Sequence, residues 1–558
     1  MWVHMRTKRA LVFEKLRDPS VFRTAYILNL FFCSVCFWDF AGIVVNVLMF
    51  LWAGVFFFDL FISRKSPRRI RYGSVLLAFL GAGLITALLH IDSGFGMNLI
   101  MLYHAAVCFF LFYGLHAEPD RRKTKREMNR IFGLIMVLST ALAVGGLAIV
   151  AFAPTGRLYV SDYILGIMDN RFTGLYTNPN LAAFSSVIGM VCCHILLQKR
   201  REQAPGERRI PVWLAVVCFA GNTLSLLLSD SNASLVFAIT YIVVYSFYRL
   251  YQSSIHHSGK KSVIRGLLLA ACCLTLAFSS LAIRSSCQAG VSQLVNLTTQ
   301  TQTQKTTVVD TESGSSPIAA MNVEIGRTEE YEVSSGRLGS LEQSMVLFGK
   351  FPLMGVGKGN IVPYGERYLV NGFTYTDLHD GYLTILISNG LVGLSIFAAF
   401  VLLFGRRLIH CLRKNRDKNL KELPMLFAAI GAYGVYGFFE KAVLFDVTFM
   451  VVIFWLLLGY TASRMTKYEW QEAPAAEFGM LSLGSSHSPV YNVYPLPSHR
   501  EPVKLHTHDI PSTRYSSSDS VSSYSTYLQS TARKLNEKPT GTDRAPLREH
   551  PPSERWNS

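Results

Sequence analysis

One histidine stands where a polar segment of the chain gives way to an apolar one. His379 lies in the run DLHDGYLTILISNGLVGL, residues 377–394. An imidazole has an ordinary pKa of about 6.5, so it can accept a proton near neutral pH. Asp377 and Asp380 flank His379 and could orient its ring. A lone histidine at an interface is structural more often than catalytic, so the neighbouring residues decide the interpretation.

Two cations precede this histidine in the run GRLGSLEQSMVLFGKFPLMGVGKGN, residues 336–360. Arg337 lies at its start and Lys358 near its end. The glycines around Lys358 permit a close approach of the backbone to a ligand. The run is not a P-loop, because it lacks the Lys-Ser/Thr ending. An ionisable base beside cations is the strongest indication of function in this chain.

A third cation lies in the run RFTGLYTNPNLAAFSS, residues 171–186. The dipeptide Asn178-Pro179 predicts a turn, and Asn180 is expected to cap the helix that follows. Arg171 would then lie near free N–H groups, and together they suit an anion such as phosphate. The alternative is an interfacial arginine that extends toward lipid headgroups.

Two acidic residues are expected near the same face. Asp230 lies in the short turn SDSNASL, residues 229–235, and could bind an acceptor, orient a cation or be a solvated turn carboxylate. Glu440 lies in FFEKAVLFD and could pair with Lys441 or face a cavity. Charges at the edges of membrane spans are functional candidates by default.

The composition indicates what kind of element positions these residues. Of the 558 residues, 50% are hydrophobic and 16% are charged, with a mean hydropathy of +0.28. A soluble protein would carry about 25% charged residues. Apolar runs long enough to cross a bilayer recur along the chain. We therefore expect an all-α polytopic membrane protein.

The charge pattern predicts the topology. Twelve spans are expected near residues 22–38, 41–62, 72–89, 97–115, 131–152, 179–197, 211–228, 233–248, 266–283, 381–404, 424–439 and 443–461. Lys and Arg cluster in alternate short loops, which follows the positive-inside rule and explains the net charge of +17 without a nucleic-acid partner. Both termini are then cytoplasmic.

These spans divide the chain into five parts. They are a cytoplasmic N-terminus (1–21), nine helices (22–283), a large extracytoplasmic loop (284–378), three helices (379–461) and a cytoplasmic tail (462–558). The tail is rich in Ser and Pro and is predicted to be disordered.

Within the large loop, two segments differ in pattern. The polar stretch 292–318 is low in complexity and is expected to be flexible. A short amphipathic helix is predicted to start near Ser340 and lie along the membrane interface, because Leu341, Met345 and Phe348 recur at helical spacing.

Taken together, these motifs resemble the O-antigen ligase and polymerase superfamily, whose members are polytopic bacterial glycosyltransferases with the fold often called GT-C. The resemblance covers about residues 70–460. Its motifs are RFTG-x5-N, an S-x-S, a GR followed by FPLMGVGKGN, and HDGYLTILISNGLVGL. It implies a protein of the bacterial cytoplasmic (inner) membrane.

The resemblance also implies a reaction. A glycan on undecaprenyl diphosphate would be attacked at its anomeric carbon by an acceptor hydroxyl of a glycan, a lipid or a protein. His379 matches the general base, and Arg171 and Arg337 match arginines that neutralise the leaving diphosphate, where fixed cations stabilise the growing charge. The donor is already activated, so no nucleotide or metal cofactor is expected. Relatives often have an arginine where this chain has Asn232, so either another cation, such as Lys358, replaces it or the donor is held differently.

Two other classes of function remain open. A polysaccharide exporter or other transporter would place broken helices and charges at the bilayer midplane. The expected spans carry few central charges, and the sequence shows no internal repeat. A structural or sensory membrane protein would need no base, so it would tolerate the loss of the His379 imidazole.

Overall fold

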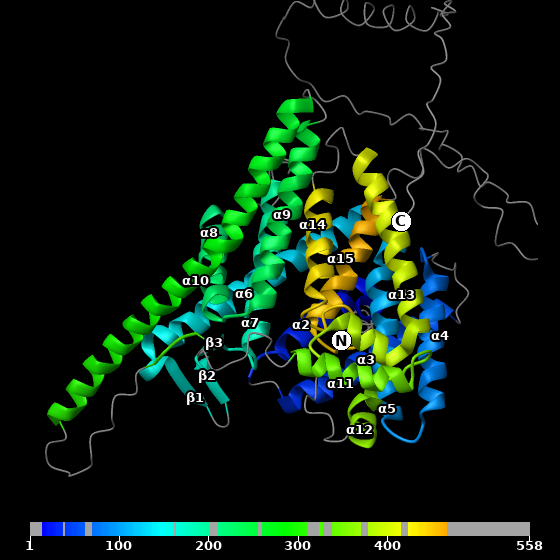
Figure 1. Cartoon of the computed structure of the whole chain (residues 1–558), viewed down its shortest axis with the longest axis horizontal. Helices are drawn as coiled ribbons and strands as arrows, with labels where there is room; N and C mark the ends of the chain where they lie inside the picture. Colours follow the sequence, from blue (N-terminus) through cyan, green and yellow to red (C-terminus); the bar gives the residue numbers. More distant parts are fainter. Residues whose placement is uncertain are drawn as a thin grey trace, which may run out of the picture. The chain divides into compact units, whose positions relative to one another are not determined.

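Helices form at each place where a span is expected (Figure 1). The computed structural model describes residues 14–36, 39–61, 70–160, 163–200, 210–254, 259–309, 323–326, 337–369, 378–414 and 422–465. The helices at the expected spans are α2 (Pro19–Phe32), α3 (Asp39–Phe61), α4 (Gly73–Leu89), α5 (Phe95–Ala106), α6 (Arg121–Phe152), α7 (Pro179–Arg200), α8 (Val212–Leu228), α9 (Asn232–Ser254), α10 (Gly259–Val309), α13 (Gly381–Lys414), α14 (Leu423–Tyr436) and α15 (Phe449–Met465).

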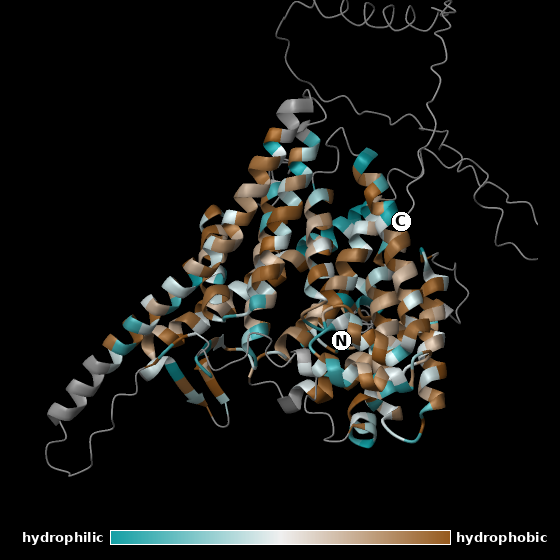
Figure 2. Ribbon diagram, in the orientation of Figure 1, coloured by the Kyte–Doolittle hydropathy of each residue, from teal (hydrophilic) through white to brown (hydrophobic). Residues whose placement is uncertain are grey.

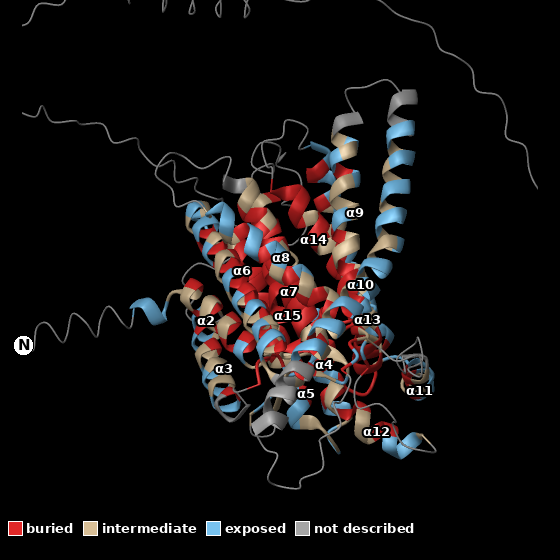
Figure 3. Cartoon of the chain, turned by 90° about the vertical axis from the view of Figure 1, so that its left-hand side faces the viewer, coloured by how far each residue is buried: buried red, intermediate tan, exposed pale blue. Residues whose placement is uncertain are grey.

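Their length and composition suit a membrane. Within the described residues, seven helices are long and apolar enough to cross a bilayer, and four more are shorter and apolar. The count of twelve crossings stays a prediction. Hydrophobic residues line much of the bundle (Figure 2), and the fully buried Tyr433, Tyr436 and Trp455 lie in its core. Figure 3 shows the buried residues gathered around α7, α14 and α15, with α10 largely exposed.

Some helices begin or change pitch where the sequence predicted otherwise. The basic run after Asp120 was expected to be a loop, but it forms the first turns of α6, capped by the Asp120 carboxylate. After α5, the chain continues as a π-helix, η1 (Val107–Phe112), and a 3₁₀ helix, η2 (Tyr113–Ala117). Arg23 donates to the Leu111 carbonyl of η1 at 3.0 Å and to both carboxylate oxygens of Glu127, at 2.6 and 2.8 Å. This buried ion pair connects α2, η1 and α6.

The mostly helical chain also contains one small sheet. This three-stranded antiparallel sheet follows the short 3₁₀ helix η3 (Pro154–Gly156), with strands β1 (Arg157–Val160), β2 (Tyr163–Met168) and β3 (Arg171–Gly174) in the order β1-β2-β3. Ile167 and Phe172 of the sheet are buried against Val150 of α6, so the segment gains apolar contacts that its local sequence does not reveal.

The large loop also begins differently from the prediction. α10 continues without interruption from Gly259 to Val309, so residues 292–309 form a helix where a flexible stretch was expected; residues 310–318 lie outside the described part of the chain. Residues 292–309 contain no Gly or Pro, and extending an existing helix costs far less than starting one. Asn296 also exchanges two hydrogen bonds with the backbone of Val323, at 2.8 and 3.1 Å.

The second half of the loop carries three short elements. They are α11 (Arg337–Lys350), η4 (Lys358–Asn360) and α12 (Ile361–Tyr368), which lie at the same end of the bundle as the sheet (Figure 1). The structure confirms a helix near Ser340. Leu347 of α11 is buried, whereas Leu341 and Met345 are 43% exposed. The exposed apolar side chains are compatible with the predicted position along a membrane interface.

The loop is fixed to α13 by a break in that helix at Gly390. Gly390 has φ 62° and ψ −165°, and the amides of Leu391 and Val392 turn away from the carbonyls four residues earlier, to which they would bond in a regular helix. These two amides and the two carbonyls instead form hydrogen bonds with segment 352–357. The Pro352 and Leu353 carbonyls accept from the two amides at 2.9 and 3.1 Å. The amides of Val356 and Gly357 donate to the carbonyls of Ile387 and Ser388 at 3.0 and 2.8 Å.

This break predicts different effects for two glycines of the same helix. In Gly390→Ala, the new Cβ would clash with the Leu353 carbonyl in a backbone conformation that side chains rarely adopt. We expect a loss of stability of about 3 kcal/mol or more, because strain of about 1–3 kcal/mol adds to the clash. Gly405→Ala meets open space and is expected to be neutral or stabilising by up to about 1 kcal/mol. Thermal unfolding of both purified variants measures the difference, and equal melting temperatures would contradict the description of the break.

Candidate active site

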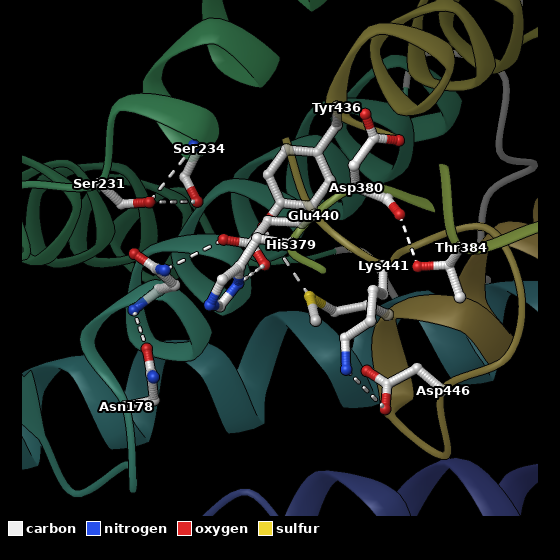
Figure 4. Close-up of polar contacts among 12 residues, drawn as sticks. Asn178, Ser231, Ser234, His379, Asp380, Thr384, Tyr436, Glu440, Lys441 and Asp446 are labelled. Carbon is white, nitrogen blue, oxygen red and sulfur yellow. Dashed lines mark hydrogen bonds and ion pairs between the residues drawn. The ribbon is translucent and has the colours of Figure 1, made fainter. Parts of the chain in front are cut away.

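Four of the predicted side chains form one chain of polar contacts, and Figure 4 shows the pair His379 and Glu440 within it. His379 contacts Glu440, Glu440 contacts Asn180, and Asn180 contacts Arg171. These residues come from the start of α13, the turn after α14, the first turn of α7 and strand β3. The contact between Asn180 and Glu440 joins residues that are 260 positions apart in the sequence.

His379 lies two residues before α13. Asp380 caps the helix, because its carboxylate accepts from the amides of Tyr382 and Leu383 at 2.8 and 2.9 Å. The Gly381 amide donates to the Gly437 carbonyl at 2.7 Å and so holds the start of α13 on the turn after α14. His379 has φ 25°, a value that non-glycine residues rarely adopt and that recurs at functional sites. Its side chain is 47% exposed, so a substrate can reach it.

Glu440 is the carboxylate that orients the imidazole. Its Oε2 lies 3.5 Å from Nδ1 of His379, and its side chain is only 8% exposed. The sequence pointed to Asp377 or Asp380 for this task. Asp377 lies outside the described residues, and the Asp380 carboxylate faces the helix amides. Lys441 lies near Asp446, with 3.8 Å between Nζ and Oδ1.

The structure corrects the role of Asn180. Asn178 caps α7, because its Oδ1 accepts from the Asn180 amide at 2.7 Å, and Pro179 occupies the first helical position. The Asn180 side chain is thereby free for a different task. Its Nδ2 donates to Glu440 at 3.0 Å, and its Oδ1 accepts from Nη2 of Arg171 at 2.8 Å. It connects the predicted base to the predicted anion-binding cation.

Arg171 reaches from β3 to the turn between α8 and α9. Its Nε donates to the Ser229 carbonyl at 3.0 Å and its Nη2 to the Asp230 carbonyl at 3.3 Å. The guanidinium is therefore held by protein groups, which excludes a side chain that only extends toward lipid headgroups.

Asp230 is not a solvated turn carboxylate. It is 4% exposed, and its Oδ1 lies 2.9 Å from Nη1 of Arg284 on α10. Of the functions considered for it, orienting a cation is the one that the structure supports. Sequence reasoning missed Arg284, and the available signal was its position directly after the apolar run 266–283.

The two loop cations lie on the short elements of the large loop. Arg337 begins α11, but its side chain lies outside the described residues. Lys358 begins η4, whose residues Gly359 and Asn360 bond to Asn98 and His90 at 2.6 and 3.0 Å, at the connection between α4 and α5.

Further contacts reinforce that connection. Tyr364 donates to Asp92 at 2.9 Å, and Arg367 lies 2.9 Å from the same carboxylate, so Tyr364 first and Arg367 second lower the pKa of Asp92. Burial, followed by the Asp92 hydrogen bond, raises the pKa of Tyr364 to about 12. In the part of the chain that the structure describes, no three His, Cys, Asp or Glu side chains gather into a metal site.

Comparison with known families identifies the domain that contains much of this site. The model of the O-antigen ligase family matches residues 213–398. The match supports membership of the O-antigen ligase and polymerase superfamily. The O-antigen ligase domain includes Asp230, Arg284 and His379, whereas Arg171 and Asn180 precede it and Glu440 follows it. A search of curated proteins finds no match.

The family match confirms the resemblance and supports glycan transfer at a membrane as the general function. The geometry adds a detail that the match does not contain. Arg171, Asn180 and Glu440 lie outside residues 213–398, and folding joins them into one chain of contacts with His379, which lies inside that range.

The orientation of the imidazole predicts the effect of Glu440→Gln. With Glu440, Nδ1–H faces a carboxylate and Nε2 is left as the proton acceptor. A Gln amide could still accept from Asn180, but its N–H₂ would face Nδ1 and favour the opposite tautomer. We expect glycan transfer to fall at least about 10-fold with little change in melting temperature, because a misplaced general base loses up to about 10²–10⁴ in rate.

Membranes with matched protein levels measure this effect, with Glu342→Gln, an exposed glutamate on α11, as the control. Wild-type transfer by the Glu440→Gln variant would show that the contact does not orient the base.

Proposed function

We propose that this protein transfers a glycan from undecaprenyl diphosphate to an acceptor hydroxyl at the outer face of the bacterial cytoplasmic membrane. The observation that carries the proposal is the contact chain from His379 through Glu440 and Asn180 to Arg171, in a helical membrane protein with an O-antigen ligase domain. It supports the proposal because an imidazole and a guanidinium then belong to one connected set of side chains.

The reaction follows from these roles. Nε2 of His379 takes the proton of the acceptor hydroxyl while its oxygen forms a bond to the anomeric carbon of the donor sugar. The bond between that carbon and the diphosphate oxygen breaks, and the electron pair leaves with the diphosphate. Arg171 faces the charge that grows there, and its fixed position avoids reorganisation in the transition state. Glu440 stabilises the imidazolium that forms.

The charges of the site suggest why further cations are needed. Arg171 and Arg284 carry two positive charges, and Asp230 and Glu440 carry two negative ones, so these four side chains sum to zero. A diphosphate brings at least two more negative charges. We include Arg337 and Lys358 of the outer loop among the donor-binding residues for this reason, together with Asn180, which orients Arg171.

The proposal includes three classes of acceptor: a hydroxyl of another glycan, of a lipid or of a protein. The proposal includes no nucleotide or metal, because the sugar–diphosphate bond is already activated. It has the large loop outside and both termini in the cytoplasm, as the basic loops predict.

Replacement of the base tests the proposal. We expect His379→Ala to reduce transfer by about 10²-fold or more, because it removes the general base. Cells lacking the protein would be complemented with wild type, His379→Ala, Arg171→Ala or Arg337→Ala, and their surface glycan and lipid-linked pool would be profiled. His410→Ala is a matched control, because His410 is exposed on the same helix, α13.

The expected result is a loss of surface glycan with accumulation of undecaprenyl-linked units in the His379→Ala cells and normal glycan in the His410→Ala cells. Polymer length would then separate polymerisation from ligation. If His379→Ala cells have normal surface glycan at matched protein levels, the base assignment is wrong, and a transport function becomes the better explanation.

A further inference from the structure

We infer that Arg284 of α10 is the second guanidinium of the donor site and binds the diphosphate together with Arg171, with Asp230 and Asn232 as its positioning residues. The inference rests on the proposed function and adds a residue that the sequence motifs do not identify.

The first support is that both guanidiniums meet one short turn. Arg171 donates to the carbonyl oxygens of Ser229 and Asp230 at 3.0 and 3.3 Å. Arg284 contacts the Asp230 carboxylate at 2.9 Å and donates to Oδ1 of Asn232 at 2.6 Å. One turn of four residues thus holds two cations from different elements, β3 and α10. Two planar donor groups at one place suit a ligand with two phosphoryl groups.

The second support is that the contacts of Arg284 to the turn involve only one nitrogen of its guanidinium. Both contacts to the turn involve Nη1, so they leave Nη2 and Nε of the guanidinium to other partners. The side chain is 18% exposed, while Asp230 is 6% exposed, so the arginine lies on the open side of the pair. Asp230 holds Arg284 in place before a ligand arrives.

The third support is the position of Arg284 along its helix. The apolar run 266–283 ends directly before it, so a spanning α10 places this residue at the membrane surface. The phosphates of a lipid-linked donor lie at the same depth, because its lipid chain occupies the hydrocarbon region. In the topology predicted from the basic loops, this is the outer face, where the large loop also lies.

The fourth support is a common frame that fixes the distance between the two arginines. A small core joins Phe172, next to Arg171, with Leu228, next to Ser229, and with Val295 of α10. Nε2 of Gln288, one turn beyond Arg284, donates to the Leu227 carbonyl at 3.1 Å. Cations held apart in this way stabilise a ligand's charge without reorganisation.

The same frame reaches β3 through the segment 323–326. The Gly326 amide donates to the Asn170 carbonyl at 2.7 Å, directly before Arg171. On the α10 side, Ser292 accepts from the Ile325 amide at 2.9 Å. The unexpectedly long α10 therefore carries one donor-site cation and contributes to the support of the other.

Binding of lipid phosphates tests the inference directly, without requiring transfer. Affinities of undecaprenyl diphosphate and undecaprenyl monophosphate would be measured for purified wild type, Arg284→Ala, Arg284→Lys and Arg265→Ala, all in the His379→Ala background. We expect Arg284→Ala to weaken diphosphate binding about 10-fold or more, as loss of a charge-assisted contact does. Monophosphate binding should change less, Arg284→Lys should be intermediate, and the exposed Arg265 on the same helix should have no effect.

A guanidinium returned to the turn from another backbone position tests whether Arg284 binds the diphosphate or only stabilises the fold. Asn232 lies within hydrogen-bond distance of Arg284, so Asn232→Arg in the Arg284→Ala protein returns a guanidinium to the same turn from another backbone position. We expect it to recover diphosphate affinity and, in the presence of His379, to lower the donor KM again.

Three results would overturn the inference. They are an unchanged diphosphate affinity in Arg284→Ala, an equal loss for monophosphate and diphosphate, and a lowered melting temperature with no recovery by Asn232→Arg. Failure of the proposed function can be told apart from failure of this inference. It would appear as wild-type transfer by the His379→Ala variant, independently of the diphosphate affinities that are measured.

Discussion

A chain that crosses a membrane must satisfy each backbone N–H and C=O group within the protein where water is absent. This constraint explains the main features of the fold. Most of the chain is helical, the π-helical turn gains a donor from the buried Arg23, and the break in α13 at Gly390 is filled by segment 352–357. The break thereby holds the glycine-rich part of the outer loop against the helix that begins beside His379.

The candidate site depends on a carboxylate that is almost buried. Glu440 would be costly to bury without partners, and it is stabilised by Asn180 and faces His379. Because Asn180 also contacts Arg171, its side chain joins the carboxylate beside the imidazole to the guanidinium. The positive φ values of His379 and Asp230 indicate that the surrounding contacts, and not local preference, set the backbone at both residues.

α10 connects the membrane bundle with the structure outside it. Its apolar half is exposed, as expected for a lipid-facing helix, whereas its polar half packs on the sheet and on segment 323–326. Arg284 lies at the boundary between the two halves. The sheet, α10 and the turn after α8 form one small unit around the two arginines, so this unit positions the two cations and does not merely cover them.

The sequence by itself determined the class and the places of the helices, and it predicted most residues of the candidate site. Apolar length, charge alternation and the His379 motif are local properties, and they predicted twelve helices, the superfamily and Arg171, Asn180, Asp230, Glu440 and His379. It could not determine the continuation of α10, the small sheet or the cap at Asn178, because each depends on packing against distant segments. Only the tertiary structure decided that Glu440 orients His379 and that Arg284 pairs with Asp230, since side-chain contacts between residues far apart in sequence leave no local pattern.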